Sequence, residues 1–350
     1  MSAYQAKDEA VTEAAVRWLH ETGAARNAEG RSFCLTVGYM LPHPPYVVDC
    51  GAFAQYDGRV PPPSLGQEDA GDGWHRWWRA ARGIESVSVV QRDRARAAYW
   101  GLVHRMDEMI GRVLDALDAI GATDNTLIVY ASDHGDHLGE RGLWWKHTFF
   151  EESVKVPLIM RLPSALPAGE TRAQVVNLID LSQTLLEAME VPLLPHADGR
   201  SFWNVAQNDA APWENETFSE YCTDPVPEWT GGRAVQQRMI RSGNWKLSIY
   251  DSDPPLLFDL ATDPHEQHNR ADDPACAEVL RKLTVRLTDD WAPEAIAARM
   301  RERRVEKDIL AAWAREVQPE GTHVWRFAPE INWLEQEGRI DTDTDIPMGG

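Results

Sequence analysis

The stretch NTLIVYASDHGDHLGERGLWWKH, residues 125–147, decides the fold prediction. Its first eight residues are mostly apolar or β-branched, which is typical of a buried strand. Three histidines, three carboxylates and a lysine then follow within residues 130–147. In open α/β sheets, ligands bind beyond the carboxyl ends of the strands. The stretch therefore predicts a strand with a polar ligand-binding site directly after it.

Predicted strands and helices alternate around this stretch. Residues 32–40 (SFCLTVGYM) and 156–163 (VPLIMRLP) are short and apolar, which predicts two further buried strands. Residues 8–22, 94–120 and 175–189 place apolar side chains at helical spacing. The alternation predicts an α/β fold with a largely parallel sheet.

The character of the sequence changes after about residue 215. Residues 238–251 and 254–264 predict two short antiparallel strands with turn-rich joints, and residues 274–317 predict charged helix. The tail DTDTDIPMGG is acidic, and we expect it to be disordered. The expected domains are an α/β core over residues 1–214, a small-sheet subdomain over 215–290 and a charged helical extension over 291–350.

The composition excludes several classes of protein. With 55 acidic and 35 basic residues and a formal net charge of -20, the chain lacks the basic bias of a nucleic-acid-binding surface. Residues 1–19 are polar and acidic, unlike a signal peptide, and no apolar run is long enough to cross a bilayer. The four cysteines form no CxxC pattern, which favours reduced thiols. We therefore expect a cytoplasmic protein that binds neither nucleic acid nor membrane.

Asp133 and His134 stand at the end of the predicted strand over residues 125–132. A carboxylate and a neutral imidazole at this place can bind a hard or borderline cation. Gly135 lets the backbone turn sharply beside them. Asp136 and His137 are second candidates, because their side chains should point in other directions.

Lys146 and His147 complete the candidate site. Lys146 offers a fixed cation, and His147 offers a hydrogen-bond donor or a proton-transfer group. A metal, a lysine and a histidine suit an oxyanion such as sulfate or phosphate, because charge on its oxygens needs fixed positive partners. Spacing alone leaves a second interpretation open, in which DHGDHLGERG is a solvated loop whose carboxylates pair with Arg141 and cap the next helix.

Seven segments of the chain resemble the sulfatase family, within the alkaline-phosphatase-like superfamily, and two of them, residues 175–192 and 198–202, are similar to a later helix and loop of the family. Residues 126–163 are similar to the family's metal-and-lysine block, and residues 99–130 to the helix before it. FCLTVGYMLPHPPYV, residues 33–47, resembles the strand and histidine-bearing loop that sulfatases and phosphonate monoester hydrolases place over the substrate. Residues 244–274 resemble the small C-terminal sheet, and residues 303–327 the tail of choline sulfatases. The resemblance implies an alkaline-phosphatase-like three-layer α/β/α core with a smaller C-terminal α+β subdomain.

The resemblance implies a role for each matching residue. Asp133 and His134 would be metal ligands, and Lys146 would hold a sulfate oxygen. His43 would contact the sulfate or the leaving-group oxygen, and His147 would be an auxiliary catalytic residue. His43 can instead make a structural hydrogen bond in its proline-rich turn. The metal would be divalent: calcium, as is usual in sulfatases, with manganese or magnesium as alternatives.

The formylglycine nucleophile of the family is not encoded in these 350 residues. Sulfatases convert the first residue of a C/S-x-P-x-R motif to formylglycine, and Cys34, Cys50 and Cys222 lack that spacing. An aspartate-bearing first strand that shares the metal is also missing. We therefore expect poor metal affinity from Asp133 and His134 alone. We also expect exposed sheet edges and apolar surface, which a homo-oligomer or a complementing N-terminal half would cover.

Three functions remain open at this point. The first is a sulfatase-family hydrolase that cleaves a small anionic ester, such as choline sulfate or another alkyl or aryl sulfate. The second is hydrolysis of a phosphonate or phosphate ester by the same set of residues. The third is a catalytically silent scaffold or binding protein that keeps the fold.

Overall fold

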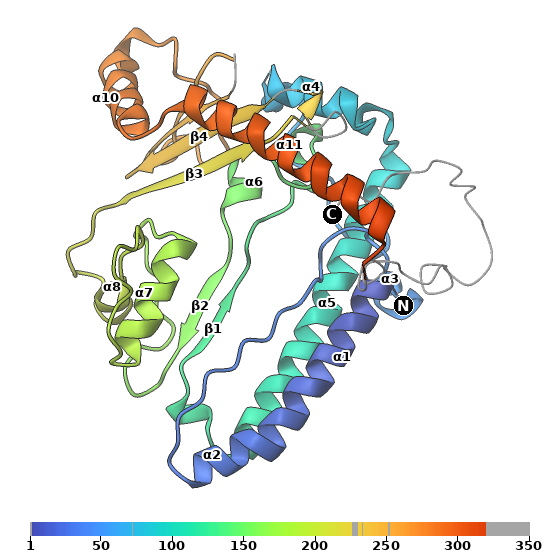
Figure 1. Cartoon of the computed structure of the whole chain (residues 1–350), viewed down its shortest axis with the longest axis vertical. Coiled ribbons are helices and arrows are strands. Elements are labelled where there is room, and N and C mark those ends of the chain that lie inside the picture. The colour runs from blue at the N-terminus through green and yellow to red at the C-terminus, as the bar shows by residue number, and fades with distance from the viewer. Residues whose placement is uncertain (1, 72, 226–229, 233, 251–252, 320–350) are drawn as a thin grey trace. The chain divides into compact units, whose positions relative to one another are not determined.

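A computed structural model describes residues 2–71, 73–225, 230–232, 234–250 and 253–319 (Figure 1). The acidic tail, for which we expect disorder, lies outside the described residues. The described chain divides into two compact units, residues 2–60 with 93–120 and residues 61–92 with 121–319. Each unit is described by itself below. The expected domain boundaries at residues 214 and 290 stay predictions.

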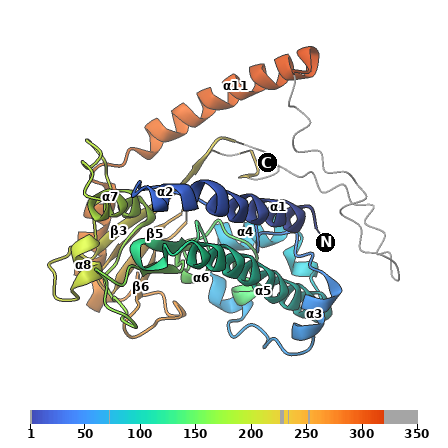
Figure 2. The same ribbon diagram turned by 90° about the horizontal axis from the view of Figure 1, so that it is seen from below.

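The first unit is helical, as the sequence predicts for residues 8–22 and 94–120. Helix α1, Ala3–Trp18, begins at Ser2, whose hydroxyl accepts from the Gln5 amide, and it continues through a π-helical turn into α2, Ala24–Ala28. Most of the 31-residue helix α5, Val89–Ala119, belongs to the same unit and runs beside α1 (Figures 1 and 2). Arg112 of α5 pairs with Glu9 of α1 at 2.6 Å.

A short third helix packs closely on α5. Helix α3, Cys50–Tyr56, is capped by Asp49, whose carboxylate accepts from the Ala52 amide. A side chain at Gly101 would touch the backbone of Ala52, so glycine permits this close approach of the two helices. Ala52 and Leu102 are fully buried there, so the contact between α3 and α5 forms part of the apolar core of this unit.

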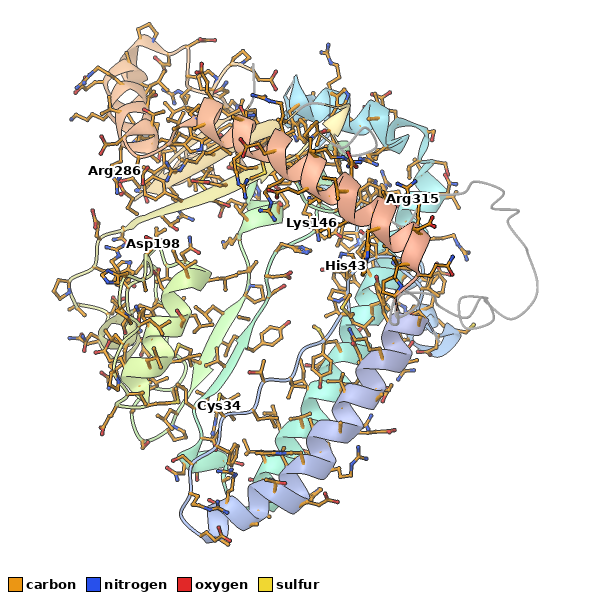
Figure 3. The ribbon with its side chains drawn as sticks, in the orientation of Figure 1. Cys34, His43, Lys146, Asp198, Arg286 and Arg315 are labelled. Carbon is orange, nitrogen blue, oxygen red and sulfur yellow. The ribbon has the colours of Figure 1, made fainter. Side chains whose placement is uncertain are left out.

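The predicted strand over residues 32–40 is wrong. This segment, which Cys34 marks in Figure 3, is extended, but it joins no sheet within the described part of the chain. Its side chains alternate, with residues 33, 35, 37 and 39 half-buried and residues 32, 34, 36 and 38 exposed. The residues have the period of a strand, but a strand also needs a partner for its backbone hydrogen bonds.

In the second unit, the strand that precedes the candidate site is β1, Ile128–Ala131, and it pairs with β2, Leu158–Arg161. The pairing is antiparallel, with Ile128 opposite Arg161, so the prediction of a largely parallel sheet is wrong for the described strands. The physical reason lies in the connection between them. Parallel neighbours need a crossover, usually a full helix, whereas residues 132–157 contain an irregular loop with one 3₁₀ turn and the four-residue helix α6, Glu151–Val154.

A four-stranded antiparallel sheet follows, in the order β3-β4-β5-β6. The strands are Glu216–Thr223, Val235–Ser242, Trp245–Ile249 and Leu256–Asp259. The residues for which we predicted two strands therefore supply most of β4 and all of β5 and β6. Strands β4 and β5 form a hairpin that turns at Gly243, whose φ of +57° suits glycine.

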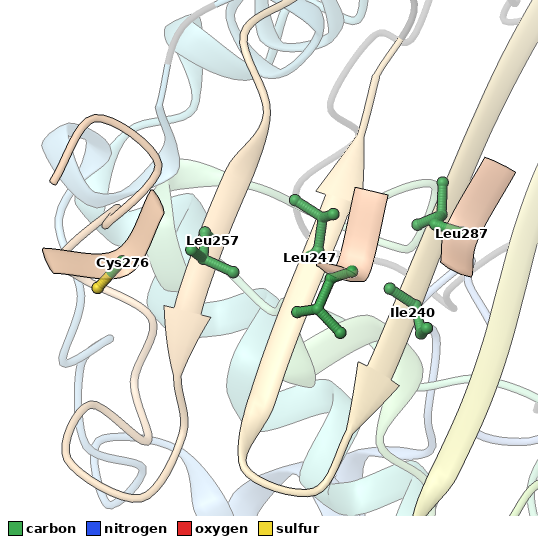
Figure 4. Close-up of a cluster of buried hydrophobic side chains, with 6 residues drawn as sticks. Ile240, Leu247, Leu257, Cys276 and Leu287 are labelled. Atoms are coloured by element: carbon green, nitrogen blue, oxygen red, sulfur yellow. The ribbon is translucent and has the colours of Figure 1, made fainter. Parts of the chain in front are cut away.

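One face of this sheet carries an apolar core of the second unit. Ile240, Leu247 and Leu257 are fully buried there against Leu283 and Leu287 (Figure 4). The two last residues belong to helix α10, Ala277–Thr288, which covers the sheet. The long helix α11, Pro293–Val317, follows, so the prediction of helix over residues 274–317 is confirmed.

The remaining elements of the second unit are short. Helix α7, Leu178–Ala188, begins at Asn177 in a capping box with Asp180. The others are α4, Trp74–Ala81, α8, Trp203–Gln207, and 3₁₀ turns at Gln67–Ala70, Ile84–Ser86, Thr123–Asn125, Glu140–Gly142 and Pro274–Cys276. Within the described ranges, no helix combines the length and the apolarity needed to cross a bilayer. The four cysteines are unpaired.

Candidate active site

The candidate site is built on the loop that leaves β1, residues 132–147, which we call the site loop. Gly135 fixes its first turn: the Gly135 amide donates to the carbonyl of Ser153 in α6 at 2.8 Å. A Cβ at this position would collide with the carbonyl oxygen of Glu152, so only glycine allows this contact. The glycine thereby presents the two preceding residues, Asp133 and His134, at the end of the strand.

Asp133, His134 and Lys146 come together, as the sequence predicts. The Lys146 ammonium (labelled in Figure 3) donates to Nε2 of His134 at 2.7 Å, and a carboxylate oxygen of Asp133 lies 3.7 Å from the same nitrogen. Nδ1 of His134 lies 2.9 Å from the carbonyl of Gly135. These contacts assign the ring proton to Nδ1 and leave Nε2 as the acceptor. The lone pair of His134 Nε2 therefore faces the Lys146 ammonium.

Lys146 provides the positive charge beside Asp133, and its side chain is half-buried. Burial lowers the pKa of Lys146, and the charges of Asp133 and Asp136 partly offset that effect. Asp133 itself is almost fully solvated. A half-buried ammonium beside an open carboxylate can exchange its present partner for the oxygens of an incoming anion.

The two predicted metal ligands supply only part of a coordination sphere. Asp133 and His134 offer a carboxylate and an imidazole nitrogen, whereas calcium takes six to eight mostly oxygen ligands. Within the described ranges, no group of three or more His, Cys, Asp or Glu side chains is placed to hold a metal ion. The two residues therefore do not fit a divalent cation by themselves.

Asp136 and His137 are the second candidates for metal binding. Their side chains instead make hydrogen bonds that hold the site loop together. One carboxylate oxygen of Asp136 accepts from the amides of Leu138 and Trp145, both at 3.0 Å, and so joins the two arms of the site loop. His137 is fully buried, with Nε2 at 2.8 Å from the Thr148 hydroxyl. Burial, and next the charge of Arg141, lowers the pKa of His137 well below its ordinary value.

His147 lies in a wall of aromatic rings beside Lys146. Its imidazole is 4.8 Å from the ring of Trp78 and 5.0 Å from that of Tyr221, and its carbonyl accepts from the Trp74 indole at 3.0 Å. Burial, and next the charge of Lys146, lowers the pKa of His147 to about 3. A histidine that stays neutral at pH 7 suits the predicted role of hydrogen-bond donor better than that of a proton-transfer group.

Sequence reasoning missed this aromatic wall, which consists of Trp74 and Trp78 of α4 with Tyr221 of β3. The signal was present in the octapeptide WHRWWRAA, residues 74–81, whose three tryptophans stand directly before or after a charged or imidazole side chain. Tyr221 gave no signal, because only the folded chain brings β3 beside α4.

His43 belongs to the first unit. Its amide donates to the Met40 carbonyl at 2.9 Å, and its Nδ1 lies 2.8 Å from the carbonyl of Pro44. The loop that carries it is held by a residue that sequence reasoning missed: the buried carboxylate of Asp8 accepts from the amides of Met40 and Leu41. Because His43 and Lys146 lie in different units, their convergence on one anion stays a prediction.

Comparison with known proteins identifies two family models that match this chain. The model of the sulfatase family matches residues 1–191. A second model, described as N-sulphoglucosamine sulphohydrolase, C-terminal, matches residues 139–292. Together the two models span the site loop and the four-stranded sheet.

Individual proteins agree with the family models. The chain is 30% identical over 300 residues to the multifunctional alkaline phosphatase superfamily protein PehA of Trinickia caryophylli, covering 79% of this chain and 57% of PehA. It is 31% identical over 297 residues to choline-sulfatase of Rhizobium meliloti, covering 80% of this chain and 55% of that enzyme. The structure of a phosphonate monoester hydrolase from Silicibacter pomeroyi superposes with a TM-score of 0.66 at 29% identity, covering 78% of this chain and 57% of that one. The chain thus spans little more than half the length of these relatives.

Proposed function

The chain belongs to the sulfatase family, with the α/β fold of the alkaline-phosphatase-like superfamily, and from this premise we propose that it serves the hydrolysis of a small sulfate ester. Choline sulfate or another alkyl or aryl sulfate is the proposed substrate class. One observation supports the proposal above the others: Lys146 points its ammonium at His134, beside Asp133, at the end of β1. This arrangement offers an anion a fixed positive partner next to an open surface.

The residues of this chain would act in binding and orientation. When a sulfate group enters, its oxygens replace Nε2 of His134 as acceptors for the Lys146 ammonium. Hydrogen bonds to a charged group contribute roughly 1.5–3 kcal/mol, which corresponds to about 10- to 150-fold in affinity. We assign His147 and His43 to further contacts with the ester, His147 as a neutral donor.

We further propose that a divalent cation, calcium before manganese or magnesium, joins Asp133 and His134 when additional ligands complete its coordination. Sulfatases generally use a divalent metal, which supports this assignment. No C/S-x-P-x-R segment occurs in the sequence, so the formylglycine nucleophile would come from a complementing chain or segment. That partner would bring the remaining metal ligands as well.

A second copy of the chain is the other proposed partner. In helix α11, Val305, Ile309, Leu310, Trp313 and Val317 are each more than half exposed. At 3.6 residues per turn these side chains fall within an arc of about 140°, which makes one apolar stripe. Such a stripe supports self-association. Light scattering after size-exclusion chromatography should show a smaller mass for Ile309→Lys than for the wild type, while a wild-type monomer would contradict the proposal.

We place the protein in the cytoplasm, where unpaired thiols are stable, and cell fractionation tests this.

Binding of inorganic sulfate tests the proposed role of Lys146 without the missing nucleophile. Titration calorimetry should show saturable sulfate binding to the wild-type chain and a loss of at least tenfold in affinity in Lys146→Met. The matched control is Lys155→Met, which removes an exposed lysine nine positions further along. If Lys146→Met binds sulfate as well as the wild type, the proposed site is wrong.

Turnover tests the substrate class. The full chain, mixed with a formylglycine-bearing N-terminal segment of a sulfatase, should hydrolyse 4-nitrophenyl sulfate in the presence of calcium and lose this activity with EDTA. The second candidate, hydrolysis of phosphonate monoesters, is favoured by the similarity to the phosphonate monoester hydrolase from Silicibacter pomeroyi. Faster turnover of 4-nitrophenyl phenylphosphonate would select it. No turnover of either ester, together with no sulfate binding, would favour the silent scaffold.

A further inference from the structure

The site loop holds an unusual backbone. Four of its residues other than glycine have positive φ angles: Leu138 at 48°, Arg141 at 58°, Trp145 at 63° and His147 at 75°. For L-residues the left-handed region costs roughly 1–2 kcal/mol each, and such residues persist only where the surrounding structure enforces them. The geometry of Lys146, which stands between two of them, therefore depends on what holds the loop.

Arg141 is the first anchor of the loop. Its side chain is fully buried, and its guanidinium donates to the carbonyls of His265 and Glu266 and to the carboxylate of Glu152. The same guanidinium lies 4.0 Å from the centre of the Phe150 ring. One strained residue of the loop is thus tied both to α6 and to the segment that follows β6.

Lys246 of β5 supplies the second anchor from the sheet. Its ammonium, also buried, lies 2.9 Å from a carboxylate oxygen of Glu151 and 2.7 Å from one of Glu266. The other oxygen of Glu266 accepts from the Glu151 amide at 2.8 Å. Lys246 and Glu266 therefore hold the start of α6, against which the Gly135 turn packs.

Other groups around this cluster add little positive charge. Arg241 of β4 approaches Glu151 at 3.5 Å and is partly solvated. His75 and His137 lie close by, and burial lowers the pKa of both, so the two rings stay neutral at pH 7. The hydroxyl of Tyr250 accepts from the Phe149 amide at 2.8 Å. The two buried cations, Arg141 and Lys246, thus face the carboxylates of Glu151, Glu152 and Glu266.

A buried ion network of this kind is a poor source of stability, because removing charges from water costs about as much as their attraction returns. Its geometric effect is clearer, since each contact restricts where α6 and the site loop can lie. We propose that Lys246 and Glu266 are positioning residues, which hold the strained site loop so that Lys146 meets its anion in one geometry. This inference rests on the proposed role of Lys146 in anion binding.

Four variants of the full chain test the inference, the fourth being Lys246→Arg. Lys246→Met removes the ammonium and keeps the length of the side chain. Lys246→Met combined with Glu266→Gln removes both charges, so that no unpaired carboxylate of Glu266 remains to unfold the protein. Lys282→Met is the matched control, because Lys282 makes an exposed ion pair with Glu278 on α10.

Two measurements distinguish positioning from mere support of the fold. Amide hydrogen exchange follows Gly135, His137 and Gly139, whose amides donate to Ser153, Trp145 and Leu143. Titration with inorganic sulfate reports the anion site. In the double variant we expect at least tenfold faster exchange at these amides and at least tenfold weaker sulfate binding, with the β3–β4 amides still protected. Lys246→Arg keeps the charge and should therefore keep most of the amide protection and most of the sulfate affinity of the wild type. Lys282→Met should change neither quantity.

The outcomes separate this inference from the proposed function. If the double variant exchanges and binds sulfate within twofold of the wild type, the positioning role is wrong. Loss of protection throughout the sheet, to the same degree as in the site loop, would show a general structural role and would also overturn it. If the wild-type chain binds no sulfate, the proposed role of Lys146 fails, and with it the claim about anion geometry. The exchange data then still decide whether Lys246 and Glu266 hold the loop.

Discussion

The two sheets of the second unit are built from similar residues and differ in burial. Strand β2 contains Leu158, Ile159 and Met160, and β5 contains Leu247 between polar residues. Yet Ile159 is 61% exposed and Leu247 is fully buried. Helix α10 covers β4, β5 and β6, whereas β1 and β2 pair only with each other in the described part of the chain. Burial therefore follows from what packs on a strand rather than from how apolar the strand is.

The difference has a functional side. The covered sheet provides the fixed surface, because its β5 and the segment after β6 hold the buried ions behind α6. The uncovered pair leads into the candidate site, because the loop after β1 brings Asp133, His134 and Lys146 together. A covered sheet thus lies behind a less buried strand pair that leads into the candidate site.

The strongest way to break this comparison is to damage the covered sheet. Leu247→Ala removes a fully buried side chain from the cluster of Figure 4 and should lower the free energy of unfolding by about 2–5 kcal/mol. Urea denaturation followed by circular dichroism measures the change. A loss below 1 kcal/mol would show that this sheet is not the main source of stability.

Acid should weaken the side of the molecule next to the site. His75 and His147 are buried, and burial lowers the pKa of each to about 3, far below the value in the unfolded chain. The unfolded state therefore binds more protons as the pH falls below about 6.5, and stability decreases by roughly 1.4 kcal/mol per pH unit for each imidazole. Denaturation curves between pH 6.5 and 4.5 measure the slope. The buried His137, whose pKa also lies well below its ordinary value, adds a third imidazole, so His75→Phe should reduce the slope by about a third. An unchanged slope in that variant would contradict this account.

A smaller effect is expected where a helix docks on the covered sheet. The Asn177 side chain caps α7 and donates to the Thr217 hydroxyl at 2.6 Å and to the Phe218 carbonyl of β3 at 2.9 Å. Asn177→Ala should cost about 1 kcal/mol, while Asn177→Asp keeps the cap and loses only the donor. Equal losses in both variants would show that the link to β3, rather than the cap, stabilises this helix.

The smallest effect should come from the uncovered strand pair. Ile159→Thr keeps the β-branched shape and changes an exposed face of β2, so the free energy of unfolding should stay within about 0.5 kcal/mol of the wild type. Urea denaturation under the conditions used for Leu247→Ala gives the direct contrast. A loss above 1.5 kcal/mol would mean that something covers Ile159 in solution, for example a second copy or a complementing segment.

Local patterns predicted the elements of the fold better than their pairing. The helices α1 and α5 follow from local apolar stripes and form as expected. The antiparallel strands expected over residues 238–264 also form, but residues 238–251, expected as one strand, make the hairpin of β4 and β5. Residues 32–40 have the same local signature and form no described strand, because a strand also needs a neighbour that its own residues do not specify. The antiparallel pairing of β1 with β2 escaped prediction for a related reason: it depends on the path of residues 132–157.

The site was predictable where its residues are close in sequence. Asp133, His134 and Lys146 lie within one loop, so the motif carried their geometry. Tyr221 and Lys246 contribute from strands far along the chain, and no local pattern distinguishes them from other strand residues. The predicted meeting of His43 with Lys146 joins the two units and stays a prediction.

Gly135 has a consequence for how this sequence can vary. A methyl group at this position would already strike the carbonyl of Glu152, and that carbonyl belongs to the short helix on which the loop rests. Position 135 should therefore accept almost no replacement in a saturation library that is screened for folding, not even alanine. Position 133, whose side chain is exposed to solvent, should accept many replacements in the same screen. The contrast would let a geneticist distinguish selection for shape from selection for chemistry within three adjacent codons.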